Sequence, residues 1–230
     1  PASHAAWRER IEGWKKEFPE IYNATPADSI NPKFLCECIH AVAGDDAFIT
    51  TEVGEHQLWT AQHYPFAKPR TFITSGGLGT MGFGTGAAIG AQLANPGSRG
   101  VHIAGDGSFR MNCNELATIQ HYALPIVIVV VNNGTLGNVR LWQKVFYGKR
   151  YSQTTLDFGP DWVKLAAAYG IDGYRAANAA EFEQVFRTAF ASGKAAVIDA
   201  RVDIDEPVLP MVPGGKPIYS QIMNLDASLR

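Results

Sequence analysis

Residues 124–133, LPIVIVVVNN, form the most apolar stretch of the chain and decide its fold. An apolar run of this length, rich in Val and Ile, is typical of a strand that is buried on both faces of a parallel sheet. Two asparagines end the run, so polar side chains stand where the strand is expected to stop. The stretch is therefore predicted to be a central strand with functional groups at its carboxyl end.

The sequence on both sides of this strand alternates between strand-like and helix-like segments. Further strands are expected at 47–53, 70–74, 101–106, 173–177 and 195–202. Such alternation is typical of βαβ units, which build parallel sheets. We predict a doubly wound α/β fold, in which a mainly parallel six-stranded sheet carries helices on both faces.

Three segments are expected along the chain. Residues 1–25 are polar, helical in pattern and start without Met, so they are interpreted as a linker helix that follows an upstream domain. Residues 26–205 contain the strand and helix pattern and form the α/β domain. Residues 206–230 contain four prolines and are predicted to be a tail that lies over the site.

Length and composition restrict the class of protein. A chain of 230 residues suits one sizeable domain. Its net charge of −2 argues against nucleic acid or an anionic membrane as a partner, and no apolar run reaches the length of a membrane span. The three cysteines, Cys36, Cys38 and Cys113, are expected to be reduced thiols, which favours a cytoplasmic location.

Residues 76–84, GGLGTMGFG, contain a glycine pattern that raises the question of a dinucleotide ligand. Gly77 to Gly82 satisfy G-x-G-x-x-G, but this pattern alone is weak evidence. An NAD site also needs an acid about 20 residues further on. The nearest acid at a strand end, Asp106, stands 29 residues beyond Gly77 and between two glycines. An NAD-binding domain remains an alternative at this point.

The ends of two successive strands carry a different set of groups. In open α/β sheets, ligands bind outside the carboxyl ends of the strands. Gly105-Asp106-Gly107 follows one strand, and Asn132-Asn133 ends the next. The glycines let the backbone approach an anion, and the amides of Gly107 and Ser108 can donate to phosphate. Carboxylate and amide oxygens suit Mg²⁺, which is completed by phosphate and water. These strand ends therefore predict a magnesium and diphosphate site.

This arrangement resembles the signature of thiamine-diphosphate enzymes, in which a Gly-Asp-Gly turn and a later Asn-Asn pair stand at fixed spacing. Here Ser108 and 23 further residues separate Gly105-Asp106-Gly107 from Asn132-Asn133. More narrowly, several segments resemble the C-terminal, diphosphate-binding domain of the acetohydroxyacid synthase (acetolactate synthase) catalytic subunit. They include TSGGLGTMGFG, AAIGAQLA, GDGSF, NELATI, VKLAAAYG and PMVP.

The resemblance implies a function for the larger protein. Enzymes of this family are thiamine-diphosphate-dependent transferases or lyases that decarboxylate pyruvate. They condense the hydroxyethyl unit with pyruvate or 2-ketobutyrate in branched-chain amino-acid biosynthesis. The alternatives are another thiamine-diphosphate-dependent decarboxylase, carboligase or oxidase, and a module that only binds or assembles.

The resemblance also implies roles for residues of the glycine-rich loop and of the turn after the first strand. Gly79 and Met81 are expected to meet the aminopyrimidine, with the Met81 side chain as a wedge between the two cofactor rings; the alternative is Met81 as core filler. Gly54, Glu55 and His56 are expected at the diphosphate. The family usually has Gln in place of Glu55, and an acid there is unfavourable unless it points away. His56 is either a phosphate ligand or a surface histidine.

Further roles follow from the same resemblance. Magnesium ligands are expected from Asp106, Asn133 and the backbone carbonyl of Thr135. Cofactor contacts are expected from Gly105, Gly107, Ser108, Asn133, Leu136 and Gly137.

The segment after these residues is expected to shape the substrate side of the site. Trp142 matches a tryptophan that lines the acceptor pocket, with packing on a helix face as the alternative. Asn138 and Leu141 depart from the Met and Gln that are usual in the family, which leaves acceptor preference open. Asn112 and Glu115 are interpreted as structural.

The family's enzymes contain parts that no segment of this chain resembles. A pyrimidine-binding domain, generally from a second subunit, supplies an essential glutamate, and a central domain carries most contacts to FAD. The resemblance therefore implies a homo-oligomer (a dimer or tetramer), structural FAD and a possible regulatory subunit. The 230-residue chain alone is expected to bind Mg²⁺ and diphosphate but not to turn over pyruvate.

Overall fold

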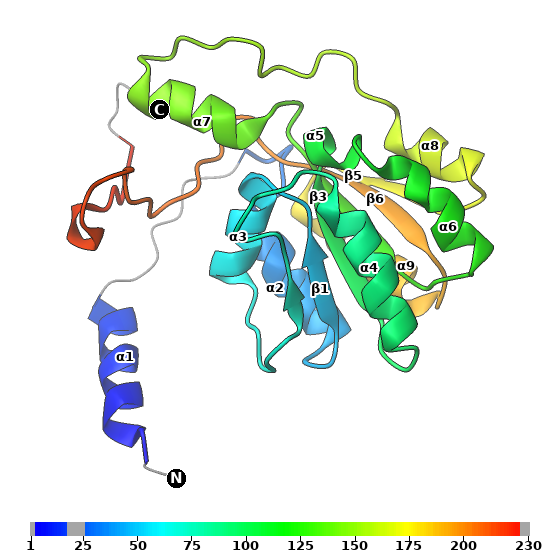
Figure 1. Cartoon of the computed structure of the whole chain (residues 1–230), viewed down its shortest axis with the longest axis horizontal. Coiled ribbons are helices and arrows are strands. Elements are labelled where there is room, and N and C mark those ends of the chain that lie inside the picture. Colours follow the sequence, from blue (N-terminus) through cyan, green and yellow to red (C-terminus); the bar gives the residue numbers. More distant parts are fainter. Residues whose placement is uncertain (1–2, 18–25, 226–230) are drawn as a thin grey trace.

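The computed structural model describes residues 3–17 and 26–225. Within these residues six strands form one sheet, in the order β2-β1-β3-β4-β6-β5, and all neighbouring strands are parallel (Figure 1). The strands are β1 (Phe48–Thr51), β2 (Phe72–Ile73), β3 (Gly100–Gly105), β4 (Val127–Asn132), β5 (Asp172–Ala176) and β6 (Ala196–Arg201). The predicted six-stranded parallel sheet is confirmed.

Strand β4 lies in the middle of the sheet, as its apolar sequence predicts. All of its residues are buried, and it pairs with β3 on one side and β6 on the other. Val127, Val129 and Val131 face one hydrophobic core, whereas Ile128 and Val130 face the other. The alternation of side chains along a strand thus explains why the run is apolar at every position.

Helices cover both faces of the sheet (Figure 1). One core contains apolar residues of α2 (Pro32–Ala43), α3 (Glu55–His63) and α9 (Ala179–Ala191). The other contains residues of α4 (Phe83–Ala94), α6 (Leu116–His121) and α8 (Trp162–Ala168). The shorter α5 (Asp106–Phe109) follows β3, and α7 (Gly137–Phe146) follows β4. Two 3₁₀ turns span Cys113–Glu115 and Ile218–Ser220.

The strand order creates a crevice between β1 and β3. From β1 the chain passes to β2 on one side, and then returns to form β3 on the other side of β1. The connections that leave β1 and β3 therefore run to opposite sides, and such a topological switch point is where open α/β sheets bind ligands. Gly54 and Asp106 begin the segments on either side of it.

Neither helix α1 (Ala5–Glu17) nor the described part of the tail from residue 206 belongs to the sheet, although Val208 of the tail packs in one core. Helix α1 buries none of its residues, and 18–25 are outside the described residues, so the linker assignment of 1–25 stays a prediction. The tail first runs along α3, where Trp59 and Gln62 donate to the carbonyls of Pro207 and Pro210. Residues 226–230 are not described. In the part of the chain that is described, no helix combines the length and apolarity needed to cross a membrane.

Candidate functional site

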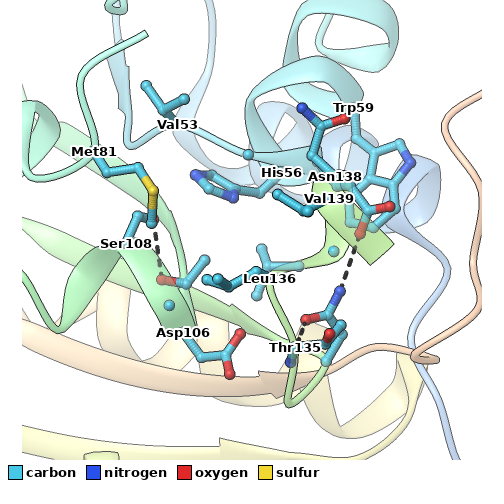
Figure 2. Close-up of a pocket in the computed structure, with 17 residues that line it drawn as sticks. Val53, His56, Trp59, Met81, Asp106, Ser108, Thr135, Leu136, Asn138 and Val139 are labelled. Atoms are coloured by element: carbon cyan, nitrogen blue, oxygen red, sulfur yellow. Dashed lines mark hydrogen bonds between the residues drawn. The ribbon is translucent and has the colours of Figure 1, made fainter. Parts of the chain in front are cut away.

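A pocket of about 130 Å³ opens at the carboxyl ends of β1, β3 and β4, at the switch point (Figure 2). We call it the strand-tip pocket. Every site residue predicted from the sequence lines it except Gly79 and Trp142. It is also lined by residues that the sequence analysis did not assign to the cofactor, namely Val53, Trp59, Val131, Asn138 and Val139.

Asp106 lies at the base of this pocket, directly after β3, and is 3% exposed. The backbone N–H groups of Asp106 itself, Asn133 and Gly107 favour the ionised form of its carboxyl group and lower its pKa. Burial raises the pKa of Asp106 to about 6, while the Arg110 charge is the strongest effect in the other direction. The group is therefore mainly ionised at neutral pH. The predicted proximity of Asp106 to Asn133 is confirmed.

Asn133 connects the base of the pocket with α3. Its Nδ2 donates to Oε2 of Glu55 at 3.1 Å, and its Oδ1 accepts from the backbone N–H of Thr135 at 3.2 Å (Figure 2). A carbonyl oxygen has two lone pairs, so Oδ1 can accept a second partner. Thr135 Oγ1 donates to the Thr154 carbonyl at 2.7 Å, which leaves the backbone carbonyl of Thr135 as its possible ligand atom.

Asn132 is turned away from the pocket, although the sequence offers it as an oxygen ligand beside Asn133. Its Nδ2 donates to Oδ1 of the buried Asp199 at 2.7 Å, and its Oδ1 accepts from the backbone N–H of Gly134 at 3.3 Å. Successive residues of a strand point to opposite faces, so only one of two adjacent asparagines can serve the site. Asn132 instead braces the turn that carries Asn133.

Glu55 is the first residue of α3 and lines the pocket. Its carboxyl group therefore does not point away from the expected diphosphate position. The residue is 5% exposed, and burial raises the pKa of Glu55 to about 8, opposed mainly by the hydrogen bond from Asn133. The carboxyl group is therefore mainly protonated and uncharged at neutral pH. An uncharged acid removes the repulsion that the sequence analysis expected beside a diphosphate.

His56 is 5% exposed, so the surface-histidine alternative is wrong. Its Nε2 is buried and has no hydrogen-bond partner among the described residues. Burial lowers the pKa of His56 to about 3, so the ring is neutral at neutral pH. Buried polar atoms are normally paired, so an orphaned ring nitrogen in a pocket indicates a missing polar partner.

The glycine-rich loop contributes less to the strand-tip pocket than the sequence predicts. Residues 76–80 are exposed, and Gly79, with φ of +71°, does not line the pocket. Met81 does line it and is only half-buried, which contradicts the core-filler alternative. The loop follows β2 at the edge of the sheet rather than a strand at the switch point, so the topology does not place it where a dinucleotide fold needs it.

A second cavity of about 470 Å³ lies beside α7 and shares Asn138 and Val139 with the strand-tip pocket. Trp142 lines this α7 pocket, is 48% exposed, and contacts the Phe146 ring edge-on at 5.7 Å. Leu141 lines neither pocket; it is 4% exposed and packs in the hydrophobic core. Neighbouring helix residues point about 100° apart, so Leu141 faces the core while Trp142 faces the α7 pocket.

The donor set of the strand-tip pocket fits a phosphate group that arrives with a hard divalent cation. Among the described residues that line it, none is Lys or Arg, so no side chain could neutralise a diphosphate. The described residues contain no group of three or more His, Cys, Asp or Glu that could hold a metal. One carboxylate with amide and backbone oxygens suits Mg²⁺, which obtains its remaining ligands from phosphate and water.

The backbone at the pocket base can be approached closely because two of its residues lack side chains. A Cβ atom at Gly105 would lie 2.7 Å from His56 Nδ1, and one at Gly107 would lie 2.7 Å from Leu136 Cδ2. The pocket volume is below the roughly 300–1,000 Å³ of complete small-molecule sites. The pocket therefore fits the anionic end of a cofactor better than a whole cofactor.

Fold and pocket together define the class of this protein, an open parallel α/β domain with a ligand pocket at its switch point. A model of the family described as "Thiamine pyrophosphate enzyme, C-terminal TPP binding domain" matches residues 52–200. The chain belongs to this family of thiamine pyrophosphate-binding domains.

Similar proteins agree with this assignment. The chain is 41% identical over 224 residues to the mitochondrial acetolactate synthase catalytic subunit of Saccharomyces cerevisiae, covering 96% of this chain and 32% of the yeast protein. It is 40% identical over 215 residues to the Escherichia coli acetolactate synthase isozyme 2 large subunit, covering 94% and 39%.

A solved structure shares the fold. The thiamine diphosphate-dependent 4-hydroxybenzoylformate decarboxylase of Rhodococcus jostii RHA1 matches with a TM-score of 0.74 and 28% identity, covering 83% of this chain and 36% of that one. The chain thus spans between about one third and two fifths of the length of these relatives.

Proposed function

We propose that this chain is the C-terminal thiamine-diphosphate-binding domain of an acetolactate synthase catalytic subunit. Identity of 40–41% over nearly the whole chain favours this enzyme over the decarboxylase, which is 28% identical. The whole protein would decarboxylate pyruvate and join the two-carbon unit to pyruvate or 2-ketobutyrate, a step of branched-chain amino-acid biosynthesis.

One observation carries the proposal: Asp106 is a buried carboxylate in a pocket that no Lys or Arg lines among the described residues. A buried carboxylate with no cation in the lining of its pocket is unfavourable, and a divalent cation would remove the penalty while attracting phosphate. Asp106, Asn133 Oδ1 and the Thr135 carbonyl would hold Mg²⁺. When bound, thiamine diphosphate supplies the carbon nucleophile that the reaction needs.

Other pocket residues would bind and orient the cofactor's anionic end. The Nε2 atom of His56, unpartnered among the described residues, would be the acceptor nitrogen of the neutral ring and would accept from a water at the anionic end, whereas the protonated Glu55 would donate to it. Ser108 keeps the turn closed, because its Oγ donates to the Gly105 carbonyl at 3.2 Å. The backbone groups of Gly54, Gly107, Leu136 and Gly137 complete the lining.

The ring end of the cofactor and the acceptor substrate would lie further out. Met81 would separate the two cofactor rings, with Gly79 beside the pyrimidine. Trp142 would bound the acceptor side, where an extra methyl group on the substrate is worth about 1–3 kcal/mol in an apolar pocket. Asn138, which lines both pockets, is the residue placed to alter acceptor preference.

The small pocket volume supports a site that another polypeptide segment completes. We propose that a pyrimidine-binding domain of a second subunit covers the ring end in a homo-oligomer. FAD, a regulatory subunit, a cytoplasmic location and a tail at 206–230 that folds over the site remain parts of this proposal. None of the described tail residues lines the strand-tip pocket.

Calorimetric titration of the chain tests the proposal. We expect Mg²⁺-dependent binding of thiamine diphosphate, no binding of NAD, and a loss of at least about tenfold in affinity, or about 1.4 kcal/mol, in Asp106→Asn. Asp172→Asn, at an exposed position on β5, is the matched control and should bind as the unmodified chain does. Binding that needs no metal, or that Asp106→Asn leaves intact, would disprove the assignment.

A further inference from the structure

The side chain of Glu52 performs a task that the cofactor motifs do not include. Glu52 follows β1 and is fully buried. Its Oε2 accepts from the backbone N–H of Gly82 at 2.6 Å, and its Oε1 accepts from that of Thr85 at 3.1 Å. Helix α4 begins at Phe83, and its N-cap residue Gly82 has no side chain to bind these N–H groups. An acid from a neighbouring strand therefore caps the helix.

Asn112 holds the same glycine from the opposite direction. Its Nδ2 donates to the Gly82 carbonyl at 2.9 Å, so side chains from two separate segments bind both polar groups of Gly82. Gly82 has φ of +90°, a conformation that favours glycine. We call the set of Glu52, Gly82 and Asn112 the Gly82 clamp.

The clamp restrains the backbone next to Met81, the residue before Gly82. The peptide between Met81 and Gly82 is the one whose N–H group Glu52 binds, and Met81 lines the strand-tip pocket (Figure 2). Residues 76–80, on the other side of Met81, are exposed, so packing does not fix them. On the amino side of Met81 the N–H groups of Gly79 and Thr80 donate to Ser75, and the bonds of Glu52 and Asn112 to Gly82 restrain its carboxyl side.

We propose that Glu52 and Asn112 are positioning residues that hold the Met81 side chain where the ring portion of the cofactor binds. The inference rests on the proposed function. The proposal predicts different effects at the two ends of the cofactor. The clamp should affect binding of the rings, which Met81 would contact. The diphosphate and metal, which Asp106 and Asn133 would hold, should be unaffected.

The ionised form of Glu52 suits this task because two oxygens accept from two backbone N–H groups. The other titratable group at hand is His102, whose Nε2 lies 3.8 Å from Oε1, and burial lowers the pKa of His102 to about 4, so this ring is neutral. In Glu52→Gln the NH₂ group would face one of the two N–H donors and leave it without an acceptor. Thr85→Val removes the weaker bond from Oγ1 to Oε1, at 3.4 Å, and the contact of Oγ1 with His102 Nε2, also at 3.4 Å. It keeps both backbone N–H bonds to Glu52 and serves as the matched control.

The experiment uses the chain labelled with ¹³C at the methionine methyl groups, with the Met81 resonance assigned through Met81→Leu. Affinities for Mg²⁺–thiamine diphosphate and for Mg²⁺–pyrophosphate are measured by calorimetry. In Glu52→Gln we expect a shifted Met81 resonance and about tenfold weaker binding of thiamine diphosphate, with pyrophosphate binding changed less than about twofold. Asn112→Ala should change the same quantities in the same direction, and Thr85→Val should change neither.

Two results would contradict the role of the Gly82 clamp in positioning Met81. If Glu52→Gln lowers only the melting temperature, with the Met81 resonance and the ratio of the two affinities unchanged, Glu52 is a helix cap alone and the inference fails. In the Met81→Ala background, Glu52→Gln should cause no further loss of affinity, and an additive loss would also contradict the clamp. Should the unmodified chain bind neither ligand, the proposed function fails, and the Met81 resonance alone then decides on the clamp.

Discussion

The base of the strand-tip pocket differs from the exposed residues around it, namely 76–80 and Trp142, which do not line the pocket and which we call the rim. At the base, Glu55, His56, Asp106 and Thr135 are each at most 5% exposed. Asn133 Nδ2 donates to Glu55, and Thr135 Oγ1 donates to the Thr154 carbonyl. At the rim, Leu78 is 90% exposed and Trp142 is 48% exposed. Groups that must bind a small, highly charged ligand are thus fixed before it arrives, whereas the rim is left for other contacts to order. The chain preorganises one end of the proposed cofactor site only.

Among substitutions at the pocket, the largest expected effect comes from adding a methyl group at the base. Gly105→Ala would place Cβ 2.7 Å from Nδ1 and 2.9 Å from Cε1 of the buried His56 ring, which must then move. Overpacking of this kind costs about 1–3 kcal/mol, and we expect a value near the upper limit because the ring is enclosed. Urea unfolding measures the loss, and calorimetry should show at least about tenfold weaker Mg²⁺–thiamine diphosphate binding.

Gly76→Ala at the rim is the matched control for this substitution. A Cβ atom there would meet only Thr74 Cγ2, at 3.9 Å, and Gly76 is not among the glycines with positive φ. We expect a change in unfolding free energy within about 0.5 kcal/mol. Equal losses from the two substitutions would show that the base is no more rigid than the rim.

The fold could be predicted from the sequence because its signals are periodic. The uninterrupted run of β4 required burial on both faces, and the alternation of strands and helices required a parallel sheet. The lengths of the strands were harder to predict from the sequence. Residues 70–74 were expected as a strand, but only Phe72 and Ile73 pair with β1, because edge strands receive hydrogen bonds on one side alone. The strand order, which creates the switch point, depends on contacts between distant segments.

The sequence predicted which residues form the site better than it predicted where their side chains point. Glycines, Asp106 and Asn133 at strand ends identified the pocket, but the sequence does not say that Asn132 turns to Asp199 instead. The protonated state of Glu55 depends on burial, which arises from packing. Glu52 was missed as a functional candidate; the available signal was an acid inside the strand-like segment 47–53, AFITTEV.

A smaller effect is expected in the pH dependence of stability. Burial lowers the pKa of His102 to about 4, below its usual value of 6.5. The free energy of unfolding therefore decreases as the pH falls from about 6.5 toward 4, because only the unfolded chain binds the proton in this range. The decrease is at most about 1.4 kcal/mol per pH unit. His102→Gln should reduce the loss between pH 6.5 and 5 by about 1.5 kcal/mol in urea unfolding curves.

The groups around His102 set the choice of variant and control. Thr50 Oγ1 lies 3.0 Å from Nδ1 of His102, so a Gln side chain can keep a polar partner. Burial raises the pKa of Glu52, which adds stability as the pH falls, and it does so equally in every variant that retains Glu52. His121→Gln, at an exposed position on α6, is the matched control. A profile for His102→Gln that matches the unmodified chain would show that this part of the interior admits the proton without penalty.

The smallest expected effect lies at the rim. Trp142→Ala removes a large side chain, yet Trp142 is 48% exposed and makes an edge contact with Phe146, which is itself 41% exposed. We expect the free energy of unfolding to change by less than about 0.5 kcal/mol, whereas Trp162→Ala, in the core at 1% exposure, should lose about 3–5 kcal/mol. Urea unfolding of both variants makes the comparison within one residue type. A loss above about 1 kcal/mol for Trp142→Ala would mean that this ring stabilises the isolated chain. The packing alternative would then explain its presence without any acceptor substrate.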